Sequence, residues 1–162
     1  MRAVATIVLV LAAVCAASCT TQQGTGGMDI AVAKQSVDSL WTGYAVAMDR
    51  HDAAAMGSLF TEDARLDLDK SPTRTGRAAV QASLDSLYRD FDATGFRVRP
   101  DDFKISGTLA VQAGEFEEDG SRPGKPPERT YGRYVMVLEM GEKGAWKIAR
   151  LTAIADSIRP LP

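Results

Sequence analysis

Residues 36–64 read SVDSLWTGYAVAMDRHDAAAMGSLFTEDA and contain the pattern on which the fold depends. Before Asp49, apolar residues recur at steps of three and four, which predicts one buried face of a helix over 29–49. Asp29 can cap the start of this helix, and Asp52 can cap a short second helix. The predicted buried residues of the two helices are Val37, Leu40, Trp41, Tyr44 and Met48, then Met56, Leu59 and Phe60.

Downstream of these helices the apolar period shortens to two. Leu66 and Leu68 alternate with charged residues, as in a half-buried strand, and Gly76 precedes a third helix. Beyond Gly95 the alternation predicts four strands and one long loop: strands over 96–106, 109–117, 130–140 and 145–155, and the loop over 119–127. Helices followed by hairpin-linked strands predict an α+β fold with a largely antiparallel sheet.

The first 19 residues have the pattern of a secretory signal peptide. Arg2 precedes an apolar run over 3–17, and small residues stand before Cys19. This ending resembles a bacterial lipoprotein signal, in which the cysteine after the cleavage site carries lipid; the alternative is a plain cleaved signal with Cys19 as an ordinary residue. The predicted division of the chain is a signal peptide over 1–18, lipidated Cys19 with a flexible tether over 19–28, a folded domain over 29–157 and a tail over 158–162.

This signal also predicts where the protein resides. The lipid on Cys19 would attach an exported protein to the bacterial envelope. Thr20 is not the aspartate that is associated with retention at the inner membrane. We therefore expect a lipoprotein of the outer membrane that faces the periplasm.

Composition removes several classes of partner and site. A formal net charge of −2 disfavours nucleic acid as a partner. His51 is the only histidine and lies in a predicted exposed turn. With Cys19 lipidated, only carboxylates remain as metal ligands, without the spacing of a zinc site, so neither a metal nor a cofactor is predicted.

Several short motifs point to a known family. They are Leu40-Trp41-x-x-Tyr44, Met48-Asp49-x-x-Asp52, Leu59-Phe60-Thr61-Glu62-Asp63-Ala64 and Gly76-Arg77-x-x-Val80, followed by Gly132-x-Tyr134 and Gly144-Ala145-Trp146-Lys147-Ile148. Over nearly all of residues 36–152 the chain resembles the nuclear transport factor 2-like superfamily, in its SnoaL-like and ketosteroid-isomerase-like branch. The resemblance implies a cystatin-like cone with three helices, in which a curved, mostly antiparallel sheet of four to six strands wraps around the long first helix. The folded domain would then be a SnoaL-like domain with a cone-shaped pocket.

The resemblance also bears on catalysis, because members include isomerases, cyclases, dehydratases and structural association domains. Tyr44 falls where the isomerase branch has its oxyanion-hole tyrosine; the alternative is a core tyrosine bonded to backbone. The position of the general base falls on Leu68, which cannot move a proton. Alternation points the flanking Asp67 and Asp69 away from the pocket. No catalytic residue is therefore assigned.

Arg133 and an acidic run over 115–119 are two further charged features of the predicted strands. Arg133 would select an anionic ligand if its face lines the pocket, because guanidinium matches carboxylate geometry, and both faces remain open. The acidic run over 115–119 leads into the long loop and is interpreted as a solvated strand end. The strands over 130–140 and 145–155 are apolar on both faces, which fits either a second subunit on the outer face or ordinary apolar exposure.

These observations predict a membrane-anchored domain that binds a small apolar or anionic molecule in an apolar cone-shaped pocket. It is expected to form a homodimer through the sheet, as many members of the resembled family do. The alternatives are a non-catalytic dimeric interaction module of the cell envelope and a divergent isomerase or dehydratase. The predicted ligand-binding residues are Trp41, Tyr44, Met48, Phe60, Leu68 and Arg133.

Overall fold

The structure is a computed structural model and describes residues 29–161. Cys19, the predicted signal peptide and the tether lie outside these residues. Within residues 29–161, no helix combines the length and the hydropathy of a membrane span.

Three α-helices form as the apolar spacing predicted: α1 (Ile30–Asp49), α2 (Ala53–Ser58) and α3 (Arg77–Leu87). The predicted caps are confirmed, because Asp29 accepts a hydrogen bond from the Ala31 amide at 2.7 Å and Asp52 accepts one from the Ala55 amide at 2.8 Å. All five predicted core residues of α1 are buried. At α3 the cap is Gly76, whose φ of 88° suits a residue without a Cβ.

Six strands form one mixed sheet in the order β2-β1-β6-β5-β4-β3: β1 (Phe60–Leu68), β2 (Arg74–Thr75), β3 (Asp92–Ser106), β4 (Leu109–Ser121), β5 (Glu128–Met140) and β6 (Trp146–Pro160). A short 3₁₀ turn over Glu142–Gly144 joins β5 to β6. All neighbours are antiparallel except β1 and β6, which are parallel. The predicted fold class is thus confirmed. The four long strands extend beyond their predicted ends, so that the predicted loop over 119–127 is shorter.

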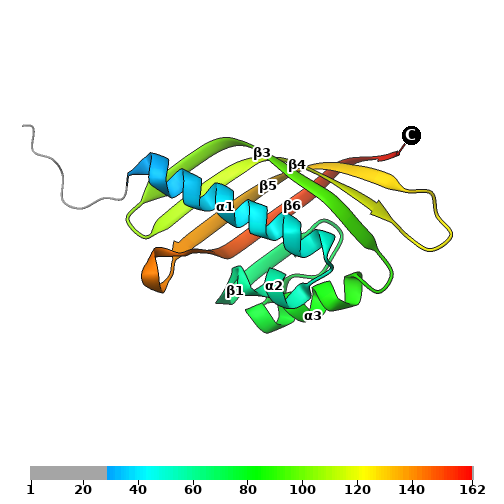
Figure 1. The fold of residues 1–162 in the computed structure, drawn as a ribbon, viewed down its shortest axis with the longest axis horizontal. Helices are drawn as coiled ribbons and strands as arrows, with labels where there is room; N and C mark the ends of the chain where they lie inside the picture. The colour runs from blue at the N-terminus through cyan, green and yellow to red at the C-terminus, as the bar shows by residue number, and fades with distance from the viewer. Residues whose placement is uncertain (1–28, 162) are drawn as a thin grey trace, which may run out of the picture.

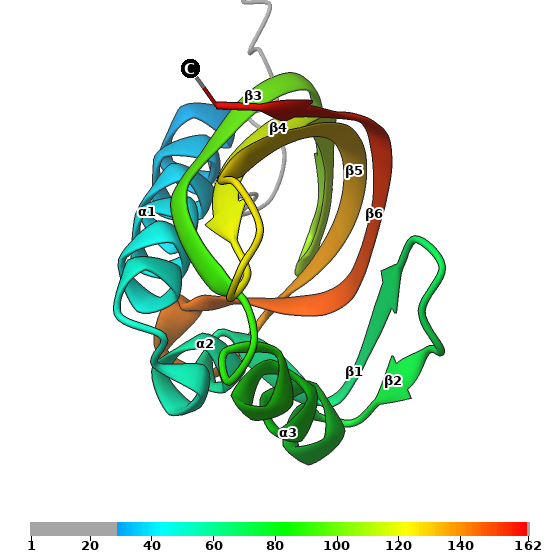
Figure 2. The same cartoon turned by 90° about the vertical axis from the view of Figure 1, so that its right-hand side faces the viewer.

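The sheet is strongly curved. Figure 2 shows β3, β4, β5 and β6 curling around an interior, with α1 along one side and with α2 and α3 near one end. Register shifts in the β3–β4 and β5–β6 pairs bend the strands locally. Glycine permits a close approach between β5 and β6, since a Cβ on Gly132 would lie 2.3 Å from the Ile154 carbonyl oxygen.

The core lies between α1 and the concave face of this sheet, as Figure 1 shows from the side of α1. Along β5, Tyr134, Met136 and Leu138 are buried on the concave face, whereas Val135 on the convex face is 49% exposed. The two apolar faces noted in the sequence therefore differ in environment. Only one of them is covered within the described chain.

Candidate functional site

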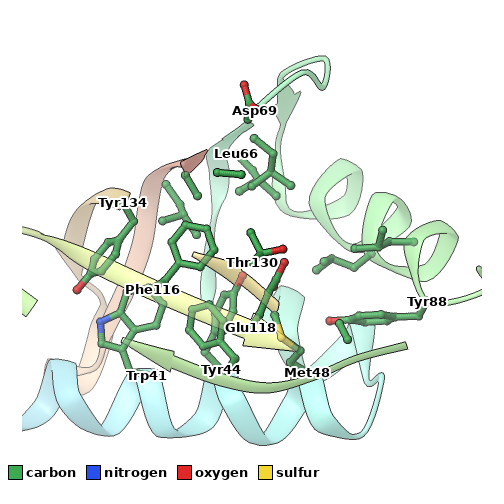
Figure 3. Close-up of a pocket in the computed structure, with 18 residues that line it drawn as sticks. Trp41, Tyr44, Met48, Leu66, Asp69, Tyr88, Phe116, Glu118, Thr130 and Tyr134 are labelled. Atoms are coloured by element: carbon green, nitrogen blue, oxygen red, sulfur yellow. The ribbon is translucent and has the colours of Figure 1, made fainter. Parts of the chain in front are cut away.

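A cavity of about 190 Å³ lies inside the cone (Figure 3). Its walls come from α1, α3 and five strands, and the exposed lining residues Asp69 and Leu87 mark where it meets solvent. Most of the lining is apolar or aromatic, as is usual for sites that bind small molecules. The 18 lining residues are Trp41, Tyr44, Met48, Leu66, Leu68, Asp69, Leu84, Leu87, Tyr88, Ala93, Phe96, Phe116, Glu118, Thr130, Tyr134, Leu151, Ala153 and Ala155.

Packed rings form one wall of the cavity. The ring centroid of Trp41 lies 5.3 Å from that of Tyr44 and 5.0 Å from that of Tyr134, both in edge-to-face geometry. The Phe96 ring lies 4.9 Å from Tyr44 and 6.1 Å from Phe116. Rings in such contact hold one another in place, so the wall is a packed aromatic surface.

A buried amide fixes the position of Trp41. The indole Nε1 donates to Oε1 of Gln112 at 2.5 Å, and the Tyr134 hydroxyl donates to the same oxygen at 3.0 Å. Gln112 is fully buried on β4. Because both donors would otherwise be buried without a partner, Gln112 holds the two rings in one arrangement.

Glu118 brings a carboxyl group into the cavity. It lies two residues after Phe116 on the concave face of β4, opposite Thr130 of β5. Within residues 29–161, no hydrogen bond or ion pair involves its carboxyl. Burial raises the pKa of Glu118 to about 7. The carboxyl is therefore poised between its acid and its carboxylate form near neutral pH.

Two tyrosine hydroxyls point toward the same interior space as Glu118 (Figure 3). Burial, with the nearby Glu118 carboxylate adding to it, raises the pKa of Tyr44 well above its usual range. The same two causes, followed by the charge of Asp52, raise the pKa of Tyr88 to about 12. Both phenols are therefore neutral at physiological pH. The Tyr88 hydroxyl is buried and has no hydrogen-bond partner among the described residues.

Tyr88 is itself supported from outside the cavity. Its ring stacks on His51 with a centroid distance of 5.0 Å, and His51 Nε2 lies 3.1 Å from Oδ1 of Asp92. His51, the histidine that was predicted to lie in an exposed turn, thus contacts Tyr88 in the structure. It packs behind a residue that lines the cavity, while its own ring does not line it.

The structure gathers four of the predicted ligand-binding residues and separates two. Trp41, Tyr44, Met48 and Leu68 all line the cavity. Phe60 does not, because the cavity meets only the far end of β1; Phe60 begins that strand and is packed in the core at 1% exposure.

Arg133 is the second predicted residue that does not line the cavity. It lies on the convex face of β5, where its guanidinium pairs with the Asp156 carboxylate at 2.8 Å. The sequence left open which face of the sheet Arg133 occupies, and the structure places it on the outer, convex face. The anionic ligand that was expected from Arg133 loses its basis, because the guanidinium is outside the cavity.

Two predictions about carboxylates were wrong. Asp69 was expected to point away by alternation, but β1 ends at Leu68, and Asp69 lines the cavity at its rim. Glu118 was interpreted as part of a solvated strand end. The signal that would have found it is alternation along β4, where Gln112, Gly114 and Phe116 share the concave face with it.

No three His, Cys, Asp or Glu side chains within residues 29–161 converge in a way that could hold a metal ion. The polar chemistry of the cavity comes instead from one interior carboxyl group and several hydroxyls. These groups can donate and accept hydrogen bonds, and the carboxyl can also exchange a proton near neutral pH.

Comparisons with known proteins agree with this architecture. The family model described as SnoaL-like domain matches residues 31–152. A search among curated proteins found no significant match.

Three solved structures illustrate the structural likeness. The ketosteroid isomerase-like protein from Erwinia carotovora atroseptica SCRI1043 has a TM-score of 0.68 at 16% identity, covering 76% of this chain and 95% of that one. The NTF2-like superfamily protein from Salmonella enterica serovar Typhimurium LT2 has a TM-score of 0.71 at 15% identity, covering 80% and 94%. Hexachlorocyclohexane dehydrochlorinase LinA-type3 from Novosphingobium barchaimii LL02 has a TM-score of 0.66 at 17% identity, covering 81% and 91%. At these identities the likeness shows the fold alone.

Proposed function

Because the chain belongs to the SnoaL-like domain family, we propose that it uses the cavity of that fold to bind a small, largely apolar molecule. The observation that carries the proposal is the packed aromatic wall around an interior space with only a few polar groups. Many apolar walls with a few placed polar groups are what ligand sites have in common.

The size of the cavity limits the ligand. An engineered apolar cavity of about 150 Å³ binds benzene. The cavity here has about 190 Å³, which suits a single ring that carries a short substituent. The Tyr44 hydroxyl and the Glu118 carboxyl would then meet the substituent, while the aromatic wall meets the ring.

A cavity-filling variant tests this function. Ala153 lines the cavity from β6, so Ala153→Phe should fill it. Native mass spectrometry of the purified protein should detect a retained small molecule, or calorimetry should detect binding of benzyl alcohol, and Ala153→Phe should remove either signal. Ala113→Phe, on the convex face of β4, is the matched control and should leave binding unchanged. Equal binding by wild type and Ala153→Phe, or none by wild type, would contradict the proposal.

A second candidate, an isomerase or dehydratase, is favoured by Glu118. A carboxyl with a pKa near 7 inside a cavity can remove and return a proton at neutral pH. A small test substrate is 3-cyclohexen-1-one, whose isomerisation moves one proton from C2 to C4 and produces a conjugated ketone that absorbs in the ultraviolet. Catalysis by wild type that is lost in Glu118→Gln would support this candidate. Equal rates in the two proteins would reject it.

The N-terminal sequence is the basis for a proposal about the cellular location of the protein. We propose that the signal is cleaved before Cys19, that Cys19 carries lipid, and that the domain faces the periplasm from the outer membrane. The tether over 20–27 contains no apolar residue, and a flexible segment of this length reaches about 15 Å. Membrane fractionation should recover the wild type with envelope membranes and Cys19→Ser in the soluble fraction. Recovery of both in the same fraction would contradict lipid anchoring.

The convex face supports the proposed homodimer. Val111, Val135 and Ile154, from three adjacent strands, are each at least 40% exposed there. Clustered apolar exposure on a sheet face is typical of an interface. Light scattering should give twice the monomer mass for wild type and the monomer mass for Val135→Lys. A monomeric wild type would contradict the dimer.

A further inference from the structure

All the residues with charged side chains that line the cavity are acidic. Among its 18 lining residues there are two carboxylates, Asp69 at the rim and Glu118 inside, and there is no lysine, arginine or histidine. An anionic ligand would meet like charge with no cation to offset its desolvation. A cationic ligand would meet a carboxyl group that lacks a partner among the described residues.

The walls also suit a cation. Six of the lining residues are aromatic, and the faces of such rings attract ammonium groups that lie within about 6 Å. The attraction is strongest where the cation is removed from bulk water. The six aromatic lining residues are Trp41, Tyr44, Tyr88, Phe96, Phe116 and Tyr134.

Hydrogen-bond acceptors converge beside Glu118. Thr130 lies directly opposite on β5, and the Tyr88 hydroxyl is buried without a partner (Figure 3). An alkylammonium has three N–H donors and no acceptor, so it needs several acceptors close together. The Glu118 carboxylate, with these hydroxyl oxygens around it, provides such a set.

We propose that the cavity selects a small primary amine that carries one ring, bound as its ammonium ion with Glu118 as the charged partner. This inference rests on the proposed binding function and specifies the chemical class of its ligand. The ring would lie against the aromatic wall, and the ammonium would lie at the Glu118 carboxylate.

Binding of a cation requires that Glu118 be ionised, and this makes affinity depend on pH. Four other titratable residues line the cavity with Glu118. They are Tyr44 from α1, Asp69 after β1, Tyr88 after α3 and Tyr134 from β5; the lining residues of β3 and β6 are not titratable. The tyrosines stay neutral below pH 9, so Glu118 is the interior group that changes charge near neutrality. Ammonium binding should therefore strengthen as the pH rises from about 5.5 to about 8.

The experiment compares three probes of matched shape: benzylamine, benzyl alcohol and benzoate. Calorimetry on the purified protein at about pH 8 should show benzylamine binding about tenfold or more tightly than benzyl alcohol, with no detectable binding of benzoate. The advantage of benzylamine should shrink at about pH 5.5, where Glu118 is protonated. The pH profile of wild type tests the inference without any substitution.

Glu118→Gln should remove the preference for benzylamine over benzyl alcohol, and a circular dichroism spectrum equal to that of wild type should show that the variant is folded. The matched control is Glu117→Gln, because Glu117 is the adjacent residue, on the convex face, where it pairs with Arg97 at 2.5 Å. This control should retain the preference.

The outcomes separate the two proposals. If benzyl alcohol binds as tightly as benzylamine at about pH 8, the amine inference is wrong and the binding function stands. An unchanged preference in Glu118→Gln would also overturn the inference. If none of the probes binds, the proposed binding function fails, and the amine inference fails with it.

Discussion

Replacing Glu118 by glutamine should change how the stability of the protein depends on pH, whether or not a ligand is known. Glutamine has nearly the same shape but never ionises. In wild type, burial raises the pKa of Glu118 from 4.5 to about 7. The native state therefore holds this proton more tightly than the unfolded chain does, and ionisation works against folding.

The difference in the pKa of Glu118 between the native and the unfolded protein determines how the free energy of unfolding changes with pH. Below pH 4.5 Glu118 is protonated in both the native and the unfolded protein, and its contribution to stability is fully present. Between pH 4.5 and about 7 the unfolded chain loses the proton first, so the free energy of unfolding falls as the pH rises. Above about pH 7 the loss is complete. It amounts to roughly 3 kcal/mol as an upper value, because Glu118 is only partly shielded from solvent.

Urea unfolding, followed by the fluorescence of the buried Trp41 and Trp146, measures this effect. We expect the free energy of unfolding of Glu118→Gln, relative to that of wild type, to rise steadily from about pH 4.5 to about pH 7. The difference between the two proteins should stay constant above about pH 7. The exposed Glu139 on β5 gives the control, and Glu139→Gln should follow the wild-type curve. Parallel pH curves for wild type and Glu118→Gln would refute the reasoning, because they would mean that Glu118 titrates alike in both states.

Three further substitutions test other parts of the structure. Gln112→Ala should lower the free energy of unfolding by about 2–4 kcal/mol in urea titrations, because it leaves two buried donors unpaired and opens a void. Gly132→Ala should lower the thermal midpoint, with a loss of about 1–3 kcal/mol, because its Cβ would lie 2.4 Å from the Phe116 ring; an unchanged midpoint would contradict this contact. Arg133→Gln removes only an exposed ion pair, so calorimetry should show unchanged benzyl alcohol binding and unfolding should change by less than about 1 kcal/mol.

The sequence predicted best where local pattern and burial agree. The first helix needed no tertiary information, because its apolar residues share one face and Asp29 caps it. The long strands were found by alternation, but their ends were not. β4 runs to Ser121 through an acidic run because the curled sheet gives that segment partners on both sides.

The interior of the site was harder to predict because curvature determines it. Arg133 belongs to a strand that is apolar on both faces, so alternation alone could not choose its side. Glu118 has charged neighbours on both sides in sequence, and composition therefore indicated solvent. Only its step of two from Phe116, together with the bend that closes the cone over that end of β4, puts its carboxyl inside.

The parallel pairing of β1 with β6 has a consequence for how the chain folds. Leu66 lies beside Leu151, so the first strand acquires this neighbour only when almost the entire polypeptide is available. Contacts between such distant segments slow folding, because a large loop must close before they form. A chain released before residue 146 lacks a central strand and leaves β1 separated from β5. If the protein is secreted as its N-terminus predicts, the late pairing of β1 with β6 would leave the domain incompletely folded until its last strand emerges. An incompletely folded chain can still pass through a translocon.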